Sequence, residues 1–507
     1  MSTPTMVSDV SIAETLATAG LQGQVLLPGD AEYVARQDSY WSNSVKGLQP
    51  AAIVQPRSAQ EVSATLRALV ATKTKFAIRS GGHTQFAGAN NIGADGVTID
   101  LGKLNWTRFH ADPGAEKAVD IGPGARWRDV YTALQGLEGG RYVVAGGRDG
   151  NVGVAGLLLG GGKTYFTAKR GFACDDVVAY EVVLADGRIV TAEAGTETED
   201  LFRALKGGSN NFGIVTNFRM KAFELGDIWG GLTFYPKTAM DGATRALVAF
   251  TDRVQEDVES NLLCFYTYMG CRVLTLSWQP EFKDVVIAAA FVQVAGVENA
   301  PAYNDWQQLP SIMTTCKKTT LLGIAVEYSV APQGFYDTFA TACFKNDERI
   351  VSKAAELHDQ LVQELKAFIP DGNFITQCLF QPLPRVIAQR SAAAGGNMLG
   401  VEKQTANGLL LVAVGMVRTA EQEAFLQPRL RAWVQAVRDF AATLQVGDGD
   451  GNLDWIYLNY ADASQDPLAS YGTENVEKLR SVAAKYDPDQ VFQRLCPGGF
   501  KVSKAKS

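Results

Sequence analysis

The sequence predicts an α+β fold, and three observations lead to that class. Short apolar runs alternate with amphipathic segments, but not as a repeated strand–helix–strand array. Glycine is dense up to about residue 226 and sparse after it. The chain has 507 residues, enough for a large core and several domains. We therefore expect a first lobe at residues 1–222, a second domain at residues 223–450, and a segment at residues 451–507 that rejoins the first lobe.

The first half of the chain shows recognisable starts and ends of helices and strands. Ser58 and Glu61 form a capping box that opens a helix through residue 69. An apolar run at residues 75–79 predicts a strand, and Asp186-Gly187 predicts the turn of a hairpin at residues 181–190. The same criteria predict further strands at residues 96–100 and 119–121, and helices at residues 126–135 and 200–205.

The second half of the chain alternates longer elements. Apolar runs predict buried strands at residues 274–278, 285–294 and 409–417. Helical periodicity is assigned to residues 337–344, 349–368 and 421–444. The charged end of the chain, residues 501–507, is expected to be frayed.

Composition and charge exclude several functions. Hydrophobic residues make up 46% of the chain and charged residues 20%, which is ordinary for a globular protein. The net charge is −7 and no basic tract is present, so we expect neither a nucleic-acid partner nor binding to an anionic membrane. Residues 1–20 do not resemble a signal peptide and no run is long enough to span a membrane, so we expect a cytoplasmic protein.

The cysteines and histidines do not predict a metal site. None of the seven cysteines forms a C-x-x-C pair, and only three histidines are present. Free thiols in a reducing compartment are the simplest interpretation.

The segment Arg79-Ser80-Gly81-Gly82-His83 is the most informative in the chain. Two adjacent glycines after a strand let consecutive backbone N–H groups turn toward one point, as in loops that bind phosphate. Arg79 offers a donor fork suited to a diphosphate, and His83 extends from the same loop. The alternative is a tight surface turn with an incidental histidine.

Residues 146–162 hold the highest density of glycines in the protein. Their spacing suggests a dinucleotide-binding fold of the Rossmann type as an alternative. That alternative also requires an acidic residue about 20 positions further on, at the end of a second parallel strand. No such residue is found, so the sequence disfavours it.

A set of short motifs in a fixed order resembles a known family. The motifs are Arg79-Ser80-Gly81-Gly82-His83, Gly122-Pro123-Gly124, Val152-Gly153-Val154-Ala155-Gly156, Gly171-Phe172-Ala173-Cys174-Asp175-Asp176-Val177, Val183-Leu184-Ala185-Asp186-Gly187 and Asn211-Phe212-Gly213-Ile214-Val215-Thr216. Together they resemble the FAD-binding domain of the vanillyl-alcohol oxidase superfamily. The tail, with Tyr457-Leu458-Asn459-Tyr460 and Tyr486-Asp487-Pro488, is similar to that of the berberine-bridge-enzyme branch.

This resemblance implies where a flavin binds. FAD would lie across two subdomains of the first lobe, beside a substrate domain whose antiparallel sheet is covered by helices. His83 matches the histidine that bonds covalently to the flavin 8α-methyl group. The resemblance and the loop composition together assign cofactor binding to Arg79, Ser80, Gly81, Gly82, His83, Thr84, Gln85, Gly88, Gly122, Gly147, Asp149, Asn151, Val152, Gly153, Gly156, Gly213, Ile214, Val215 and Asn459.

The chain also departs from the family pattern. Many relatives attach the flavin a second time through a cysteine, and Asp149 stands at that position, so a single attachment through His83 is implied. Leu157 replaces a histidine of plant relatives, and Lys163 replaces a tyrosine found in some members. Val152 matches a valine that accompanies reactivity with O2 in relatives.

Tyr460 matches the catalytic base of several relatives, and Asn459 an asparagine near the flavin. A tyrosine acts as a base only when a cation or hydrogen bond favours its deprotonated form. Lys163 is the cation expected to do so. The alternatives are a core tyrosine and a solvated lysine.

The substrate is expected to be apolar. The segment Leu409-Leu410-Leu411-Val412 corresponds to a strand that carries polar partners in plant relatives, whereas Gln377, Gln381 and Asn397 remain as possible polar contacts. The sequence thus favours an FAD-dependent oxidase in secondary metabolism that takes hydride from an alcohol, phenolic or amine-type carbon, with O2 reduced to H2O2. The alternatives are a carbohydrate oxidase and a redox-neutral cyclase with structural FAD.

Overall fold

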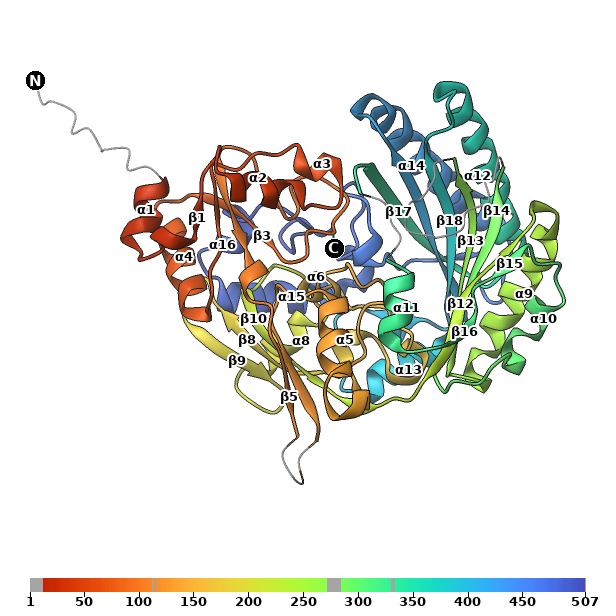
Figure 1. Cartoon of the computed structure of the whole chain (residues 1–507), viewed down its shortest axis with the longest axis horizontal. Helices are drawn as coiled ribbons and strands as arrows, with labels where there is room; N and C mark the ends of the chain where they lie inside the picture. The colour runs from red at the N-terminus through yellow and green to blue at the C-terminus, as the bar shows by residue number, and fades with distance from the viewer. Residues whose placement is uncertain (1–11, 112–113, 115, 271–283, 330–332, 507) are drawn as a thin grey trace, which may run out of the picture.

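The computed structural model describes residues 12–111, 114, 116–270, 284–329 and 333–506, and it confirms the α+β class. Figure 1 shows two lobes side by side: a first lobe built mainly from the N-terminal part of the chain and a second lobe built on one large sheet. Short helices of the described residues are α1 (Ile12–Thr18), α2 (Ala31–Asp38), α3 (Asn43–Lys46), α7 (Thr167–Arg170), α10 (Asn304–Gln307), α11 (Leu321–Glu327) and α13 (Arg385–Ala393).

The first lobe begins with a small sheet that carries the glycine motif. Its strand order is β1 (Val25–Leu26), β2 (Ala52–Val54), β4 (Gly96–Asp100) and β3 (Lys75–Arg79), and β2, β4 and β3 run parallel. Helix α4 (Ala59–Ala71) supplies the connection, and its first turn is capped because the Ser58 side chain accepts a hydrogen bond from the backbone N–H of Glu61. The loop after β3 therefore emerges at the carboxyl end of parallel strands.

A second sheet of the first lobe is antiparallel. Its order is β5 (Thr107–His110), β6 (Ala118–Ile121), β10 (Ile214–Lys221), β8 (Val177–Val183) and β9 (Ile189–Glu193). The predicted hairpin is confirmed by the pairing of β8 with β9. Helices α5 (Trp127–Gln135), α6 (Val154–Leu159) and α8 (Glu199–Leu205) belong to this part, and β7 (Tyr142–Val143) pairs with β11 (Phe223–Glu224).

The described residues of the second lobe build one nine-stranded sheet. Its strands are β12 (Ile228–Tyr235), β13 (Ser260–Met269), β14 (Val286–Gln293), β15 (Met313–Thr314), β16 (Lys317–Thr319), β17 (Tyr336–Lys345), β18 (Ile375–Leu383), β19 (Gly408–Val417) and β20 (Asn452–Leu453). Helices α9 (Met240–Arg253), α12 (Glu348–Phe368) and α14 (Ala420–Ala442) cover its outer face (Figure 1). The last strand lies just beyond residue 450, where the domain boundary was expected.

Strand β19 is apolar throughout because both faces of the sheet are buried. Leu411 and Ala413 pack in the cluster under the covering helices. Leu410, Val412 and Val414 belong to the cluster that continues toward the first lobe. Since neighbouring residues of a strand point to opposite faces, an uninterrupted apolar run is what this position requires.

One helix prediction is wrong. Residues 337–344 form most of β17, which pairs with β19 along its whole length. Ala340, Ala342 and Phe344 pack under the helices, whereas Phe339 and Cys343 pack toward the first lobe. This alternation of period two is the signature of a buried strand, and it outweighs the helical spacing of alanine and phenylalanine. The strand predicted at residues 274–278 lies outside the described residues.

The C-terminal segment returns to the first lobe, and its two labelled helices lie in that lobe in Figure 1. It contains α15 (Thr473–Tyr486) and α16 (Val491–Arg494). The expectation of a frayed end is wrong for its described residues: Lys501 is buried and donates to the carbonyl and side-chain oxygens of Asn210, and Arg480 donates to the carbonyl of Ala505. These contacts hold the segment against the glycine-rich half of the protein.

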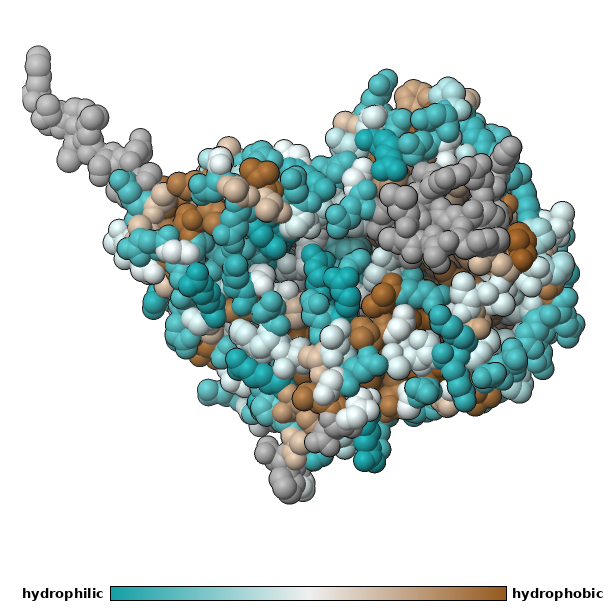
Figure 2. Space-filling view, viewed as in Figure 1, coloured by the Kyte–Doolittle hydropathy of each residue, from teal (hydrophilic) through white to brown (hydrophobic). Residues whose placement is uncertain are grey.

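Hydrophilic residues cover most of the face in Figure 2, with apolar residues scattered among them. Among the described residues, no helix combines the length and apolarity needed to cross a membrane. The same residues contain no group of three or more His, Cys, Asp or Glu side chains arranged to hold a metal ion.

Candidate active site

Two glycine-containing loops of the first lobe touch each other through their backbones. A Cβ on Gly81 would lie 2.6 Å from the Cα of Gly153, and a Cβ on Gly153 would lie 2.5 Å from the nitrogen of Gly81. Arg126 ties the loops together, because its Nη2 donates to the Gly81 carbonyl at 2.8 Å and its Nη1 donates to the carbonyl of Asn151. Only glycine fits at these two positions.

A cavity of about 530 Å³ starts at these loops and extends to the large sheet. Most predicted site residues line it: Ser80, Gly81, Gly82, His83, Thr84, Gln85, Asp149, Val152, Gly153, Gly156, Lys163, Gly213, Ile214, Val215, Asn459 and Tyr460. Residues far apart in the sequence thus meet around one space.

Five predicted site residues do not line the cavity: Arg79, Gly88, Gly122, Gly147 and Asn151. Gly122 and Gly147 serve close packing instead, since added Cβ atoms would lie 2.2 Å from the Leu104 carbonyl oxygen and 2.4 Å from the Trp127 ring. Asn151 acts through its carbonyl, which accepts from Arg126.

The expectation that Arg79 offers its donors to a diphosphate does not fit the geometry. Its side chain is fully buried behind the loop, where Nη1 donates to the Arg36 carbonyl and Nη2 to Ser39 Oγ, both at 2.6 Å. The guanidinium also lies over the Tyr40 ring at 3.7 Å. Arg79 therefore stabilises the loop through buried contacts and does not line the cavity.

His83 faces the cavity and is held by a neighbouring aromatic ring. Its imidazole stacks on Trp41 with 4.4 Å between the ring centroids and an angle of 10° between the planes. The Trp41 backbone N–H donates to the Gly82 carbonyl, which joins this ring to the glycine loop. Burial lowers the pKa of His83, and Asp149 opposes that shift only in part, so the imidazole is neutral at neutral pH.

Asp149 occupies the position where many relatives carry a second attachment point. Its Oδ1 accepts from the Asn151 backbone N–H at 2.8 Å and from Ser329 Oγ at 2.9 Å. No cysteine is among the described residues that line the cavity.

Tyr460 lies at the other end of the cavity in a closed triangle of hydrogen bonds. Arg148 Nη2 donates to the Tyr460 oxygen at 2.9 Å and to Gln381 Oε1 at 2.9 Å. Gln381 Nε2 donates to the same Tyr460 oxygen at 3.1 Å. A cation and two donated hydrogen bonds stabilise negative charge on that oxygen.

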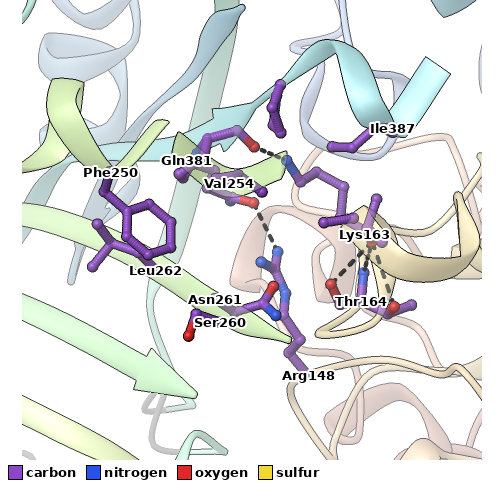
Figure 3. Close-up of a pocket in the computed structure, with 14 residues that line it drawn as sticks. Arg148, Lys163, Thr164, Phe250, Val254, Ser260, Asn261, Leu262, Gln381 and Ile387 are labelled. Carbon is purple, nitrogen blue, oxygen red and sulfur yellow. Dashed lines mark hydrogen bonds between the residues drawn. The ribbon is translucent and has the colours of Figure 1, made fainter. Parts of the chain in front are cut away.

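Lys163 is not the cation beside Tyr460, contrary to the prediction. Its Nζ donates to the Pro382 carbonyl at 2.7 Å, and its side chain is buried. Burial first, and then the nearby Arg148 charge, lower the pKa of Lys163 from 10.5 to about 7. Figure 3 shows Lys163 and Arg148 approaching from neighbouring segments, with Arg148 directed at Gln381. They also line a small adjoining cavity of about 30 Å³.

Tyr457 holds the tail against the three consecutive glycines at residues 160–162. Its oxygen accepts from the backbone N–H groups of Gly162 at 3.0 Å and Lys163 at 2.9 Å, and from Asn459 Nδ2 at 3.1 Å. Gly160 leaves room for Asn459, since a Cβ there would lie 2.0 Å from its Oδ1. Burial raises the pKa of Tyr457, so this phenol stays neutral and positions its neighbours.

The wall formed by the large sheet is mainly apolar. Its side chains come from five adjacent strands and from β17: Leu232, Phe234, Leu263, Phe265, Met269, Ala288, Ala290, Phe339, Ile375, Leu379, Val414 and Met416. Thr267, Gln377, Gln381 and Tyr328 are the polar residues beside them. Asn397, the third predicted polar contact, instead donates to buried Asp175.

The sequence did not single out three residues that build this site. Arg148 is adjacent to the glycine-rich segment, but nothing in the sequence indicates that it reaches Tyr460 from 312 positions away. Trp41 lies before all recognised motifs. Tyr457 belongs to a recognised motif, although its role as a triple acceptor depends on the fold.

The two touching loops at Gly81 and Gly153 form a cradle that fits FAD. Neither Gly81 nor Gly153 can carry a side chain, and within the described chain the backbone N–H groups of Gly81 and Gly82 donate no hydrogen bond. Such loops receive phosphate oxygens, and the cavity continues from them past His83 to Tyr460. This combination of fold and site defines a flavin-dependent oxidoreductase.

Comparisons with known proteins agree with that class. Residues 50–193 match the family described as "FAD binding domain", and residues 456–494 match "Berberine and berberine like". The chain is 38% identical over 495 residues to FAD-dependent monooxygenase drtC of Aspergillus calidoustus, covering 97% of this chain and 90% of that protein. It is 36% identical over 488 residues to FAD-dependent monooxygenase sdcF of Emericella nidulans, covering 95% and 96%.

A solved structure shows the same fold. The 6-hydroxy-D-nicotine oxidase of Arthrobacter nicotinovorans superposes with a TM-score of 0.72 at 19% identity, covering 94% of this chain and 97% of that one. The chain belongs to the berberine-bridge-enzyme-like family of FAD-dependent oxidoreductases.

Proposed function

We propose that this enzyme is an oxidase of a small apolar metabolite, with O2 as electron acceptor and H2O2 as product, in secondary metabolism. The observation that carries the proposal is Tyr460, whose oxygen faces an apolar cavity while Arg148 and Gln381 donate to it. Bound FAD would accept a hydride from the substrate and pass two electrons to O2.

The residues of the first lobe would hold the cofactor. The loops at Gly81 and Gly153 receive the diphosphate, and His83 forms the single covalent attachment. Support comes from the fixed, neutral imidazole and from the absence of cysteine among the described lining residues. The covalent bond prevents loss of the cofactor during turnover.

Tyr460 would act as the general base. In oxidation of an alcohol, a hydride leaves the carbon and a proton leaves the hydroxyl, and the carbonyl bond forms from the electrons of the O–H bond. Tyr460, whose oxygen accepts a hydrogen bond from Arg148, would take up that proton. Gln381 keeps the phenol oriented through its own hydrogen bond.

Three alternatives give different products. The names of the relatives drtC and sdcF suggest a monooxygenase, which would insert an oxygen atom into the substrate. A carbohydrate oxidase requires polar partners for several hydroxyl groups, which the apolar sheet wall disfavours. A redox-neutral cyclase would form product while the flavin stays oxidised.

Anaerobic mixing with extracts or a panel of apolar metabolites tests the proposal. We expect the true substrate to bleach the flavin absorbance and, in air, to yield one H2O2 per product without incorporation of label from isotopically labelled O2. Tyr460→Phe should slow flavin reduction by ~10²–10⁴ because the general base is lost.

Tyr142→Phe is the matched control, because this half-buried tyrosine lies outside the cavity and its hydroxyl donates to Glu224. It should reduce flavin at the wild-type rate. Product formed without bleaching would establish the cyclase, and labelled oxygen in the product would establish the monooxygenase. Reduction of Tyr460→Phe at the wild-type rate would remove Tyr460 as the base.

A further inference from the structure

The small cavity beside the main one is lined by two cations and no carboxylate. Arg148 and Lys163 are the charged side chains among its described lining residues. Figure 3 shows them reaching from neighbouring segments toward the strand that carries Gln381. Lys163 donates to the Pro382 carbonyl, and Arg148 donates to Gln381 and Tyr460. Within the described chain, no carboxylate pairs with either cation.

Neighbouring ionisable groups do not supply the missing negative charge. Burial raises the pKa of the Cys343 thiol to about 12, so this thiol is neutral beside Lys163. Asp257 accepts a hydrogen bond from Ser260 Oγ at 2.6 Å and does not itself line the cavity. Arg148 and protonated Lys163 therefore repel each other, and this repulsion contributes to the lowered pKa of Lys163.

Both cations keep donors that the described chain does not use. Lys163 Nζ has three N–H groups and donates one of them to Pro382. Arg148 donates only through Nη2, so its Nε and Nη1 are unused. Unused N–H groups on two neighbouring cations suit an anion as their ligand, because hydrogen bonds between ionised partners are the strongest ones.

The volume of the small cavity limits its ligand to a small ion. A volume of about 30 Å³ has room for one or two water molecules. It therefore admits a monatomic anion and excludes an organic molecule of substrate size. Phe250, Val254, Leu262 and Ile387 form apolar parts of the wall, where two like charges without a counter-ion are costly. A bound anion lowers that cost.

We propose that the small cavity binds one monatomic anion, chloride or a heavier halide, between Lys163 and Arg148. The ion would accept hydrogen bonds from the unused N–H groups of both side chains and leave their bonds to Pro382 and Tyr460 in place. The ligand is an inorganic ion and not the substrate, so the inference does not depend on the oxidase proposal.

Water alone is the alternative occupant, and the charge of Lys163 distinguishes the two. Burial and the Arg148 charge lower the pKa of Lys163 to about 7, so without an anion this lysine loses its proton near neutral pH. A bound anion favours the protonated lysine and raises this pKa. Anion binding is therefore linked to proton uptake, and the affinity should fall about tenfold for each pH unit above about 7.

Bromide locates the site directly, because it replaces chloride and scatters X-rays anomalously. Crystals of the flavin-loaded protein soaked in sodium bromide at about pH 6, below the pKa of Lys163, should show an anomalous peak between Lys163 and Arg148. Crystals of Lys163→Met should lack that peak. A wild-type map without bromide in the small cavity would overturn the inference. A peak that persists in Lys163→Met would show an adventitious ion only and would overturn it as well.

Thermal melting of the flavin-loaded protein measures the affinity in solution. Potassium chloride replaces potassium gluconate at constant ionic strength, because gluconate is too large for the cavity. At about pH 6 the wild-type melting temperature should rise with chloride concentration and saturate. At about pH 9 the apparent dissociation constant should be about 100-fold larger, because Lys163 is then neutral in the free protein.

Variants assign the effect to the two cations. Lys163→Met should melt independently of chloride at both pH values, and Arg148→Met should weaken chloride binding by at least about tenfold. Lys169→Met is the matched control, because Lys169 pairs with Glu259 and lies outside the cavity, and it should respond like the wild type. Equal melting in chloride and gluconate, or a chloride effect retained by Lys163→Met, would contradict the proposed site.

Discussion

His83 lies flat against Trp41 with 4.4 Å between ring centroids, and this stacking limits how its imidazole can turn. Burial lowers the pKa of His83, so its ring nitrogen has a free lone pair at neutral pH and can form a bond to carbon. We expect wild-type protein to keep its yellow colour after acid precipitation. His83→Ala should release all its flavin on denaturation, which absorbance of the supernatant measures.

Peptide mapping identifies the residue that carries the flavin, which acid precipitation does not. All flavin fluorescence should be found in the proteolytic peptide that contains His83. His110→Ala is a suitable control, because His110 lies at a sheet edge and pairs with Asp120. Flavin retained by His83→Ala after denaturation, or flavin on a peptide without residue 83, would contradict a single attachment.

At the scale of elements, the contact between the loops around Gly81 and Gly153 sets the shape of the cradle. Gly81→Ala would place a methyl group 2.6 Å from the Gly153 backbone, so the loops must separate. Overpacking of this kind typically costs about 1–3 kcal/mol. We expect a lower melting temperature and less flavin per protein, measured by calorimetry and by the ratio of flavin to protein absorbance.

Gly226→Ala is the matched control, because a Cβ there meets no atom within 4 Å and the residue does not have positive φ. It should melt and bind flavin like the wild type. Full flavin content in Gly81→Ala would show that the close approach of the two loops is dispensable.

The two glycine loops could be predicted from the sequence, whereas the hydrogen-bond partners of Tyr460 could not. Gly81 and Gly153 belong to local motifs whose composition already restricts their backbone. Arg148 and Gln381 contact Tyr460 only because three segments that are distant in the sequence converge in the fold. A long side chain can reach several partners, and the fold decides which of them it bonds. Lys163 was the plausible cation by composition, but its Nζ points to the Pro382 carbonyl.

At the scale of the whole molecule, buried Lys163 makes stability depend on pH. Its pKa falls from 10.5 to about 7 in the folded protein, so the unfolded chain binds more protons between these values. The free energy of unfolding should therefore rise with pH from about 7 to 10.5. Below about pH 7 the destabilisation caused by burying the charged lysine is complete and no longer changes with pH. Lys163→Met removes this dependence.

Thermal melting at several pH values measures the effect. The stability gained by Lys163→Met over the wild type should be largest at and below pH 7 and shrink toward pH 10.5. Lys169→Met, which removes a half-exposed lysine paired with Glu259, should show no such trend. A pH-independent difference between Lys163→Met and wild type would mean that Lys163 stays charged or neutral throughout.

The sequence predicts an element correctly where its local signals, such as a capping residue or a turn, favour the same conformation as the packing of the fold. The helix capped by Ser58 and the hairpin around Gly187 formed as expected. Residues 337–344 did not, because pairing with β19 decides their conformation. The end of the chain also differs from expectation, since Lys501 gains its contacts with Asn210 only after the tail crosses the molecule.

Because the tail returns to the cavity, residues that are synthesised late line a site whose other parts are synthesised early. Asn459, Tyr460 and Phe500 complete the cavity, yet a ribosome makes them after the loops and the large sheet that they join. A chain that ends before residue 459 therefore has the apolar wall but not the tail residues that line the cavity opposite it. A protein truncated before residue 459 therefore keeps His83 and both glycine loops but lacks Asn459, Tyr460 and Phe500, which line the cavity.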